Sequence, residues 1–287
     1  VMREIRYTIP EEFDGVQAQV FLRAMGISRR VMIRLKQSGG LIRSGAVLRT
    51  VDIVHSGEEI LLRLCDESGS PEANPGLSAE IMYEDEDAVV FNKPPYMPVH
   101  PSQRHHDDTL ANLFAAKFPG LPFRPINRLD RNTSGLCVCA KNQLAAAALS
   151  GTVSKVYFAI TESAPPGDTV SAAIGRVADS VIERCVTPDG KPAITHYVQV
   201  NEGSPALLKI TLETGRTHQI RVHMAHMGFP LLGDDMYGGD CSAIKRQALH
   251  CGEVSFISPV SGNKVTVTAP LPQDMAALID STERKTT

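Results

Sequence analysis

The spacing of apolar residues predicts a compact helical unit at the start of the chain. Apolar residues recur at helical intervals over residues 16–25 and again over residues 31–35, so two short helices are expected, with Gly26 between them. Ser28 stands where a helix N-cap belongs, because its hydroxyl can accept a backbone N–H of the first turn. A turn and a strand-like run over residues 60–64 complete a helix-helix-strand unit.

The rest of the chain is dominated by strand-like runs with fewer helical segments. The predicted strands cover residues 88–91, 136–140, 156–160, 170–177, 194–200, 207–212 and 265–267, and the predicted helices cover residues 109–117, 143–149 and 217–227. Runs of strands with occasional helices favour an α+β fold with a mixed, largely antiparallel sheet over a doubly wound parallel sheet.

A polar segment divides these two parts. Residues 66–78 are rich in Pro, Gly, Ser and acidic residues and poor in apolar ones, as a solvated tether requires. We therefore predict a small domain over residues 1–65, a linker over residues 66–78 and a larger domain over residues 79–287.

Composition excludes several classes of protein. Hydrophobic residues make up 43% and charged residues 21% of the 287 residues, which is ordinary globular usage and argues against disorder or a fibrous fold. The first residues mix acids and bases, and no apolar run reaches the length of a membrane span, so a cytoplasmic location without a membrane partner is expected. The six cysteines never form Cys-x-x-Cys, which predicts reduced thiols and neither a disulfide framework nor a zinc ribbon.

Charge is unevenly placed, although the net charge is only −3. Residues 15–50 contain no Asp or Glu and carry a set of cations, namely Arg23, Arg29, Arg30, Arg34, Lys36, Arg43 and Arg49. Such a stretch can contact the phosphates of a nucleic acid, or it can be a solvated helix face.

Asp130 is the main candidate for chemistry. It lies between Arg128 and Arg131 in a polar segment that leads into the strand-like run 136–140, and the flanking positive charge favours its ionised form. Taken alone, this segment fits a structural ion pair on a turn better than a catalyst, because ion-pair networks also occupy such positions.

Combined with two other groups of segments, the Asp130 segment resembles the RluA-type RNA pseudouridine synthase family. The matching segments are residues 83–87, 92–95 and 99–101, then residues 128–131, 133–135 and 155–157, and finally residues 213–223, 233–234 and 237–238. The similarity runs from about residue 81 to residue 272. The first 65 residues resemble the alpha-L RNA-binding fold that often precedes this catalytic domain.

The resemblance implies an enzyme that breaks the N1 glycosidic bond of a uridine in RNA and joins C5 to the sugar, without a metal or cofactor. Asp130 would be the catalytic carboxylate, Arg221 would offer it a guanidinium fork, and Tyr157 would lie against the base and remove the C5 proton. The target base would first be extruded from its stack. The residues expected to bind RNA are Arg128, Arg131, Ser28, Arg29, Arg30, Arg34, Lys36 and Arg43.

One position departs from the family. Asn127 stands where the family usually has His, so we expect it to shape the loop by hydrogen bonds and not to transfer a proton. The spacing of His218, His223 and His226 does not suggest a zinc site.

Two other functions compete with the enzyme. One is an RNA-binding assembly factor or chaperone on the same fold without activity. The other is a glycoside hydrolase, which would need a second acid near Asp130 that the motifs do not supply. The sequence favours a monomer whose partner is RNA, with ribosomal RNA preferred to transfer RNA.

Overall fold

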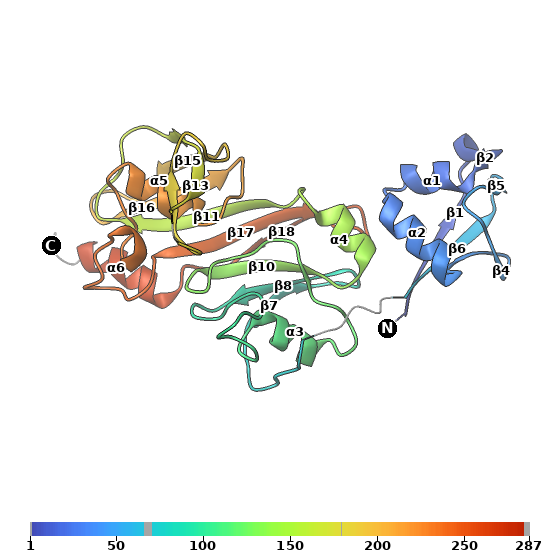
Figure 1. Ribbon diagram of the computed structural model, residues 1–287, viewed down its shortest axis with the longest axis horizontal. Coiled ribbons are helices and arrows are strands. Elements are labelled where there is room, and N and C mark those ends of the chain that lie inside the picture. Colours follow the sequence, from blue (N-terminus) through green and yellow to red (C-terminus); the bar gives the residue numbers. More distant parts are fainter. Residues whose placement is uncertain (1, 66–70, 179, 284–287) are drawn as a thin grey trace.

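The computed structural model describes residues 2–65, 71–178 and 180–283. Figure 1 shows a small N-terminal domain beside a larger domain built on one long sheet. Residues 66–70 of the predicted linker lie outside the described residues.

The N-terminal domain has two helices packed on a small antiparallel sheet. Its elements are β1 (Met2–Thr8), the 3-10 helix η1 (Glu11–Phe13), β2 (Val16–Gln17), α1 (Ala18–Ala24), α2 (Arg29–Ser38), β3 (Leu41–Arg43), β4 (Ala46–Val47), β5 (Ile53–Val54) and β6 (Glu59–Cys65). The main sheet has the order β1-β6-β3-β4. Both predicted helices are present, and Ser28 caps α2 by accepting the backbone N–H of Val31 at 3.4 Å.

The N-terminal domain has its own core, and one helix of the larger domain packs against it. Phe21, Leu22, Leu35 and Ile60 are buried in this core. Leu144, on helix α4 of the larger domain (Gln143–Leu149), belongs to the same cluster. The neighbouring Gln143 accepts a hydrogen bond of 2.9 Å from Arg34 of α2. Helices α2 and α4 face each other in Figure 1, and an apolar and a polar contact therefore hold α4 against the N-terminal domain.

The larger domain is organised around a ten-stranded sheet. Its strands are β7 (Glu80–Glu84), β8 (Ala88–Lys93), β9 (Arg124–Pro125), β10 (Ser134–Ala140), β11 (Ser154–Thr161), β12 (Thr169–Ser171), β15 (Ile194–Gln199), β16 (Ala206–Leu212), β17 (Leu249–Ile257) and β18 (Lys264–Thr268). The path is β12-β15-β16-β11-β17-β10-β8-β7, with β18 on β17 and β9 on β10. β10 and β17 pair in parallel, and the other strand pairs are antiparallel. The predicted α+β class with a mixed, largely antiparallel sheet is therefore confirmed.

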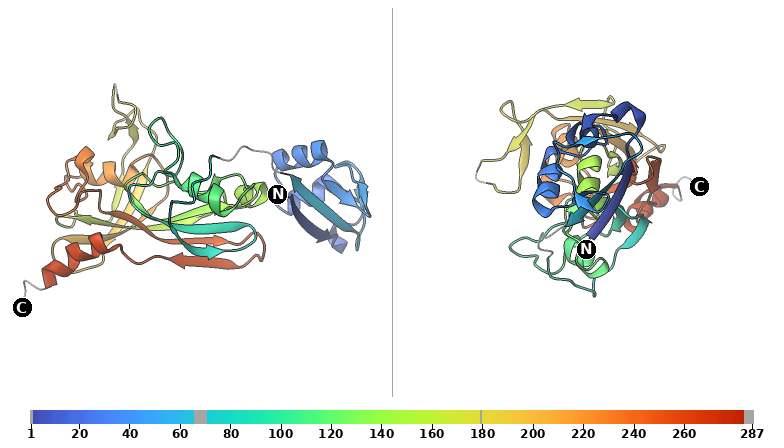
Figure 2. Two further views of the ribbon diagram at one scale, coloured as in Figure 1. Left: turned by 90° about the horizontal axis from the view of Figure 1, so that it is seen from below. Right: turned by 90° about the vertical axis from the view of Figure 1, so that its right-hand side faces the viewer.

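The helices of the larger domain are α3 (Leu110–Lys117), α4, α5 (Gln219–His226), the 3-10 helix η2 (Asp235–Tyr237) and α6 (Gln273–Glu283). One strand prediction was wrong, because residues 170–177 do not form a single strand. They divide into β12 and β13 (Ile174–Arg176), and β13 pairs with β14 (Arg184–Val186) in a separate hairpin. Figure 2 shows this hairpin projecting from the body of the domain.

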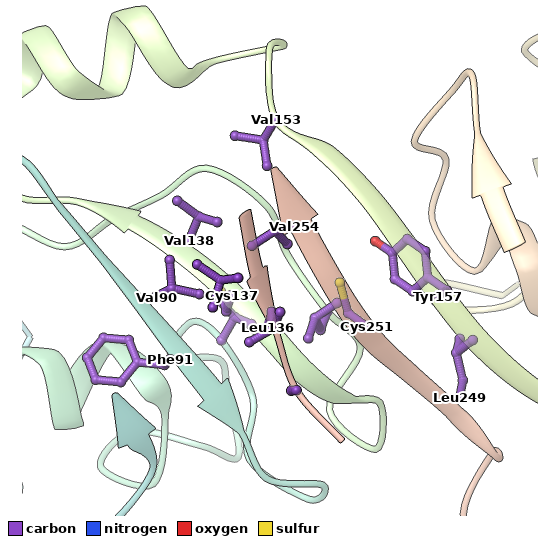
Figure 3. Close-up of a cluster of buried hydrophobic side chains, with 14 of the residues drawn as sticks. Val90, Phe91, Leu136, Cys137, Val138, Val153, Tyr157, Leu249, Cys251 and Val254 are labelled. Atoms are coloured by element: carbon purple, nitrogen blue, oxygen red, sulfur yellow. The ribbon is translucent and has the colours of Figure 1, made fainter. Parts of the chain in front are cut away.

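The core of the larger domain lies where β10, β11 and β17 run side by side. Every residue of β10 is buried, as expected for a central strand. Figure 3 shows Leu136 and Val138 of β10 near Cys251 and Val254 of β17, with Tyr157 of β11 at one side of the same cluster. A Cβ at Gly135 would lie 2.3 Å from the carbonyl oxygen of Cys251, so only glycine allows β10 and β17 to approach this closely at the start of β10.

Candidate active site

Asp130 lies on the loop of residues 127–133, directly before β10. Asn127 fixes the start of this loop: its amide donates to the carbonyl oxygen of Leu136 at 3.0 Å and accepts the backbone N–H of Val138 at 2.8 Å. The backbone N–H of Thr133 donates to the carbonyl oxygen of Asp130 at 3.1 Å. Asn127 thus shapes the loop by hydrogen bonds, as the sequence suggested.

Two buried basic side chains hold the same loop through its backbone. Nζ of Lys93, with no exposed surface, donates to the carbonyl oxygen of Arg131 at 3.1 Å. The guanidinium of Arg246 reaches the carbonyl oxygen of Asn132 at 3.4 Å and is paired with both carboxylate oxygens of Asp274 at 2.6 and 2.8 Å. Sequence analysis missed both roles, because the acceptors on the loop are backbone carbonyls, which no sequence pattern marks.

Burial lowers the pKa of Lys93 from its usual value of 10.5 to about 7, with Arg246 acting in the same direction and the charges of Cys137 and Asp130 opposing it. Between about pH 7 and pH 10 the unfolded chain therefore binds a proton at Lys93 that the folded chain has lost. Stability contributed at this site should rise with pH in that window, by up to about 1.4 kcal/mol per pH unit.

We expect the free energy of unfolding of the wild type, minus that of Lys93→Met, to increase from pH 7 to pH 10. Urea unfolding of both proteins at several pH values measures this difference. A constant difference across the window would contradict the assignment.

The carboxylate of Asp130 is paired with Arg221 of α5. Nη1 of Arg221 donates to Oδ2 of Asp130 at 3.1 Å, whereas Nε and Nη2 form a bidentate pair with Asp234 at 2.7 and 2.8 Å. The fork of Arg221 is thus directed at Asp234 and not, as the sequence analysis expected, at Asp130. Within the part of the chain that the structure describes, neither Arg128 nor Arg131 pairs with Asp130.

Asp234 orients the arginine from a completely buried position. Its side chain has 0% exposure and that of Arg221 has 6%. Burial alone would lower the pKa of Arg221, but the hydrogen bonds and charges of Asp234 and Asp130 raise it above its usual value, so the guanidinium stays charged. Gly233 makes the turn before Asp234 possible, since its φ is +74° and a Cβ there would lie 2.0 Å from the carbonyl oxygen of Arg246.

Tyr157 faces the same site from β11. The pairing of β11 with β17 shifts register between Val156 and Tyr157, and such a bulge redirects the side chains that follow it. Tyr157 is 7% exposed, and burial, followed by the charges of Cys251 and Asp130, raises the pKa of the Tyr157 phenol well above its usual value. In the free protein Tyr157 is therefore a neutral phenol and not a phenolate base.

A cleft of about 650 Å³ opens over these residues. Asp130, Tyr157 and His218 line it together with a set of cationic side chains, namely Arg128, Arg131, Lys155 and Arg216. A smaller pocket of about 70 Å³, lined by Asp130, Tyr157, His218 and Arg221, lies where the carboxylate meets the arginine. The combination suits an anionic, chain-like ligand, because a single carboxylate is surrounded by cations that can hold phosphates.

The residues predicted to bind RNA fall into two groups. Arg128 and Arg131 are exposed beside the cleft, and Arg29, Arg30 and Lys36 are exposed on α2. The others have structural contacts in this protein. Ser28 caps α2, Arg34 donates to Gln143, and Arg43 donates to the carbonyl oxygen of Ile53 at 2.7 Å and to Glu58 at 3.0 Å.

The described residues contain no group of three or more His, Cys, Asp or Glu side chains arranged to hold a metal ion. Nor does any helix in the described ranges combine the length and apolarity that crossing a membrane demands.

Comparison with known proteins places this site in a family. A sequence model described as RNA pseudouridylate synthase matches residues 87–226, which include Asp130, Tyr157 and Arg221. The chain is 40% identical over 270 residues to an uncharacterized RNA pseudouridine synthase of Bacillus subtilis, YjbO, covering 89% of this chain and 95% of that protein.

Two further similarities agree. The chain is 34% identical to ribosomal large subunit pseudouridine synthase D of Xylella fastidiosa, with 95% of this chain and 90% of that protein covered. The solved structure of human RNA pseudouridylate synthase domain containing 1 aligns with a TM-score of 0.56 at 26% identity, over 74% of this chain and 97% of that one. The chain therefore belongs to the RNA pseudouridine synthase family. It is an isomerase that converts uridine in RNA to pseudouridine.

Proposed function

We propose that this enzyme modifies uridine in the RNA of the large ribosomal subunit and that Asp130 is its catalytic residue. The observation that carries the proposal is the arrangement of Asp130: its carboxylate is paired with a buried arginine and lies in a cleft whose lining also includes four cationic side chains. The relative from Xylella fastidiosa is named for the large ribosomal subunit, and this name supports the choice of its RNA as substrate. Such RNA is found in the cytoplasm, which is the location that we propose.

The reaction breaks the bond between N1 of the base and C1′ of the ribose and forms a bond between C5 and C1′. We assign to Asp130 the attack on C1′, or the stabilisation of its positive charge, while the base is detached. Arg221 orients the carboxylate through the hydrogen bond from Nη1 to Oδ2, and Asp234 in turn holds the guanidinium in place. At the end, C5 loses its proton and N1 gains one.

We assign to Tyr157 the positioning of the base. Because burial raises its pKa, the phenol would have to lose its own proton, with RNA bound, before it could accept the C5 proton. Arg128, exposed at the edge of the cleft, is the residue that we propose to fill the space left by the extruded base or to hold a phosphate.

Release of tritium from RNA labelled at C5 of uridine tests the proposal, with large-subunit ribosomal RNA, small-subunit ribosomal RNA and transfer RNA compared as substrates. We expect release from the large-subunit RNA and at most a trace from the other two. Release from transfer RNA alone would overturn the ribosomal assignment. Binding of all three RNAs without release of tritium would favour the alternative function, an RNA-binding assembly factor without activity. The family match does not favour that alternative.

We also propose that residues 1–65 form an RNA-binding domain that acts through Arg29 and Arg30 at the exposed start of α2. Neutralising one phosphate contact reduces the salt dependence of binding by about one counterion. The double variant Arg29→Gln, Arg30→Gln should therefore bind RNA more weakly. The negative slope of log K against log salt should become shallower by about two.

Filter-binding titrations between about 50 and 200 mM salt measure this slope. Lys264→Gln, at an exposed position of strand β18, is a control for loss of a surface cation elsewhere and should keep the slope of the wild type. An unchanged slope in the double variant would contradict the role of α2.

A further inference from the structure

His218 has an unusual backbone conformation beside the catalytic carboxylate. It stands immediately before α5 with φ of 57°, in the left-handed region that residues other than Gly seldom adopt, although His, Asn and Asp do so more often than most. Its Nδ1 lies 2.8 Å from the hydroxyl of Tyr237, and its Nε2 lies 3.7 Å from Oδ2 of Asp130. The two ring nitrogens thus face different partners.

The hydrogen bonds of Tyr237 decide which nitrogen of His218 carries the proton. The Tyr237 hydroxyl accepts the backbone N–H of Arg184 at 3.1 Å, so its single proton remains to be donated. His218 Nδ1 is the acceptor within reach of that proton, at 2.8 Å. A neutral His218 that accepts at Nδ1 carries its hydrogen at Nε2, the nitrogen that faces Asp130.

Burial favours the neutral form of His218. Its pKa is lowered chiefly by burial and further by Arg221 and Arg184, while Asp130 and Asp234 oppose the shift.

The Tyr237 ring packs against its neighbours independently of the hydroxyl. It meets the His218 ring edge-on at 5.8 Å, and the Arg221 guanidinium lies over it at 4.9 Å. Replacing Tyr237 by Phe therefore removes the hydroxyl and keeps these ring contacts.

We infer that His218 and Tyr237 are positioning residues for Asp130: the Tyr237 hydroxyl locks His218 as the Nε2–H tautomer, and this N–H holds the carboxylate in its reactive orientation. The inference rests on the proposed role of Asp130. Both Arg221 and His218 approach the same oxygen, Oδ2. Oδ1 is therefore the oxygen left to meet C1′ of the ribose. The gap of 3.7 Å is longer than a hydrogen bond, so the inference requires it to shorten to one when the substrate fills the cleft.

Nitrogen NMR of protein labelled with ¹⁵N-histidine tests the tautomer directly, without RNA. The resonances of His218 are identified by their loss in His218→Gln. We expect Nε2 to be protonated and Nδ1 to be unprotonated in the wild type, and a mixture of both tautomers in Tyr237→Phe. A proton on Nδ1 in the wild type, or an unaltered tautomer in Tyr237→Phe, would overturn the inference.

Two substitutions of His218 test its action on Asp130. His218→Asn keeps a residue suited to the left-handed conformation but is too short to reach Asp130, whereas His218→Gln keeps an N–H donor at nearly the distance of Nε2. In single turnovers at saturating enzyme, we expect Asn to lower the rate about tenfold to a hundredfold, the usual effect of one hydrogen bond to a charged group. Gln should restore much of the loss, and the Kd for RNA should stay that of the wild type.

A wild-type rate in His218→Asn, or a loss confined to the Kd for RNA, would overturn the inference. A failure of the proposed function would give a different result. If wild-type protein released no tritium from any ribosomal RNA, the role of Asp130 would be contradicted, whereas the NMR experiment, which needs no RNA, would still report the tautomer of His218.

Discussion

We expect Asp130→Asn to lower tritium release by at least about a thousandfold. The amide keeps the shape of the side chain but cannot attack C1′ or stabilise its positive charge, and these are the contributions assigned to the carboxylate. The free energy of unfolding should change by no more than about 1 kcal/mol, because the Asp130 side chain is 28% exposed and Arg221 keeps its bidentate pair with Asp234. Single-turnover assays and urea unfolding measure the two quantities.

Asp168→Asn is the matched control, since Asp168 is exposed on the loop before β12 and does not line the cleft. It should release tritium like the wild type. Near wild-type release from Asp130→Asn would remove Asp130 from the catalytic role, and a parallel loss in both variants would indicate a defect unrelated to the site.

We expect Arg221→Met to have the second large effect, because it should lower both the free energy of unfolding and the activity. It leaves the carboxylate of Asp234 buried without its cation, and breaking a buried ion pair in this way costs about 3–5 kcal/mol. The same change removes the cation that orients Asp130, so activity should fall by about a hundredfold or more. Urea unfolding and tritium release report the two losses separately.

The double variant Arg221→Met, Asp234→Leu separates these roles. Replacing both members of a buried pair by apolar residues relieves the cost of the unpaired charge, so stability should return toward that of the wild type. Activity should stay low, because Asp130 still lacks its cation. Recovery of activity in the double variant would mean that Arg221 serves the fold alone.

The sequence predicted elements with a clear period and missed those without one. Helix α4 (Gln143–Leu149) was predicted at its observed bounds from its run of Leu and Ala, and in the structure Asn142 caps it by accepting the backbone N–H of Ala145. β17 lies at the centre of the sheet and was missed. Its residues include His250, Gly252 and Glu253, which break the apolar run, and pairing with β10 and β11 on both sides outweighs that weak propensity.

The site was predicted in part. The resemblance named Asp130, Tyr157 and Arg221, and the structure brings all three to one pocket. It did not reveal that the fork of Arg221 faces Asp234, although Asp234 was among the matching residues. Nor did it reveal that Lys93 and Arg246 bind the backbone of the loop that carries Asp130. A pairing between residues 91 positions apart, such as that of Arg221 with Asp130, leaves no local pattern in the sequence.

The basic stretch of residues 15–50 was also understood only in part. Charge alone could not separate cations that face solvent from those with structural contacts. Arg43 pairs with Glu58 and Arg34 donates to Gln143, whereas Arg29 and Arg30 are exposed. The partners of Arg34 and Arg43 lie on other elements and become known only from the fold.

We propose that this enzyme makes pseudouridine in large-subunit ribosomal RNA through Asp130. A map of pseudouridines in total RNA from a strain that lacks the gene, complemented with either the wild type or Asp130→Asn, tests this role in the cell. We predict that at least one pseudouridine of the large-subunit RNA disappears on deletion, returns with the wild type and stays absent with Asp130→Asn. An unchanged map on deletion, or full restoration by Asp130→Asn, would contradict the claim.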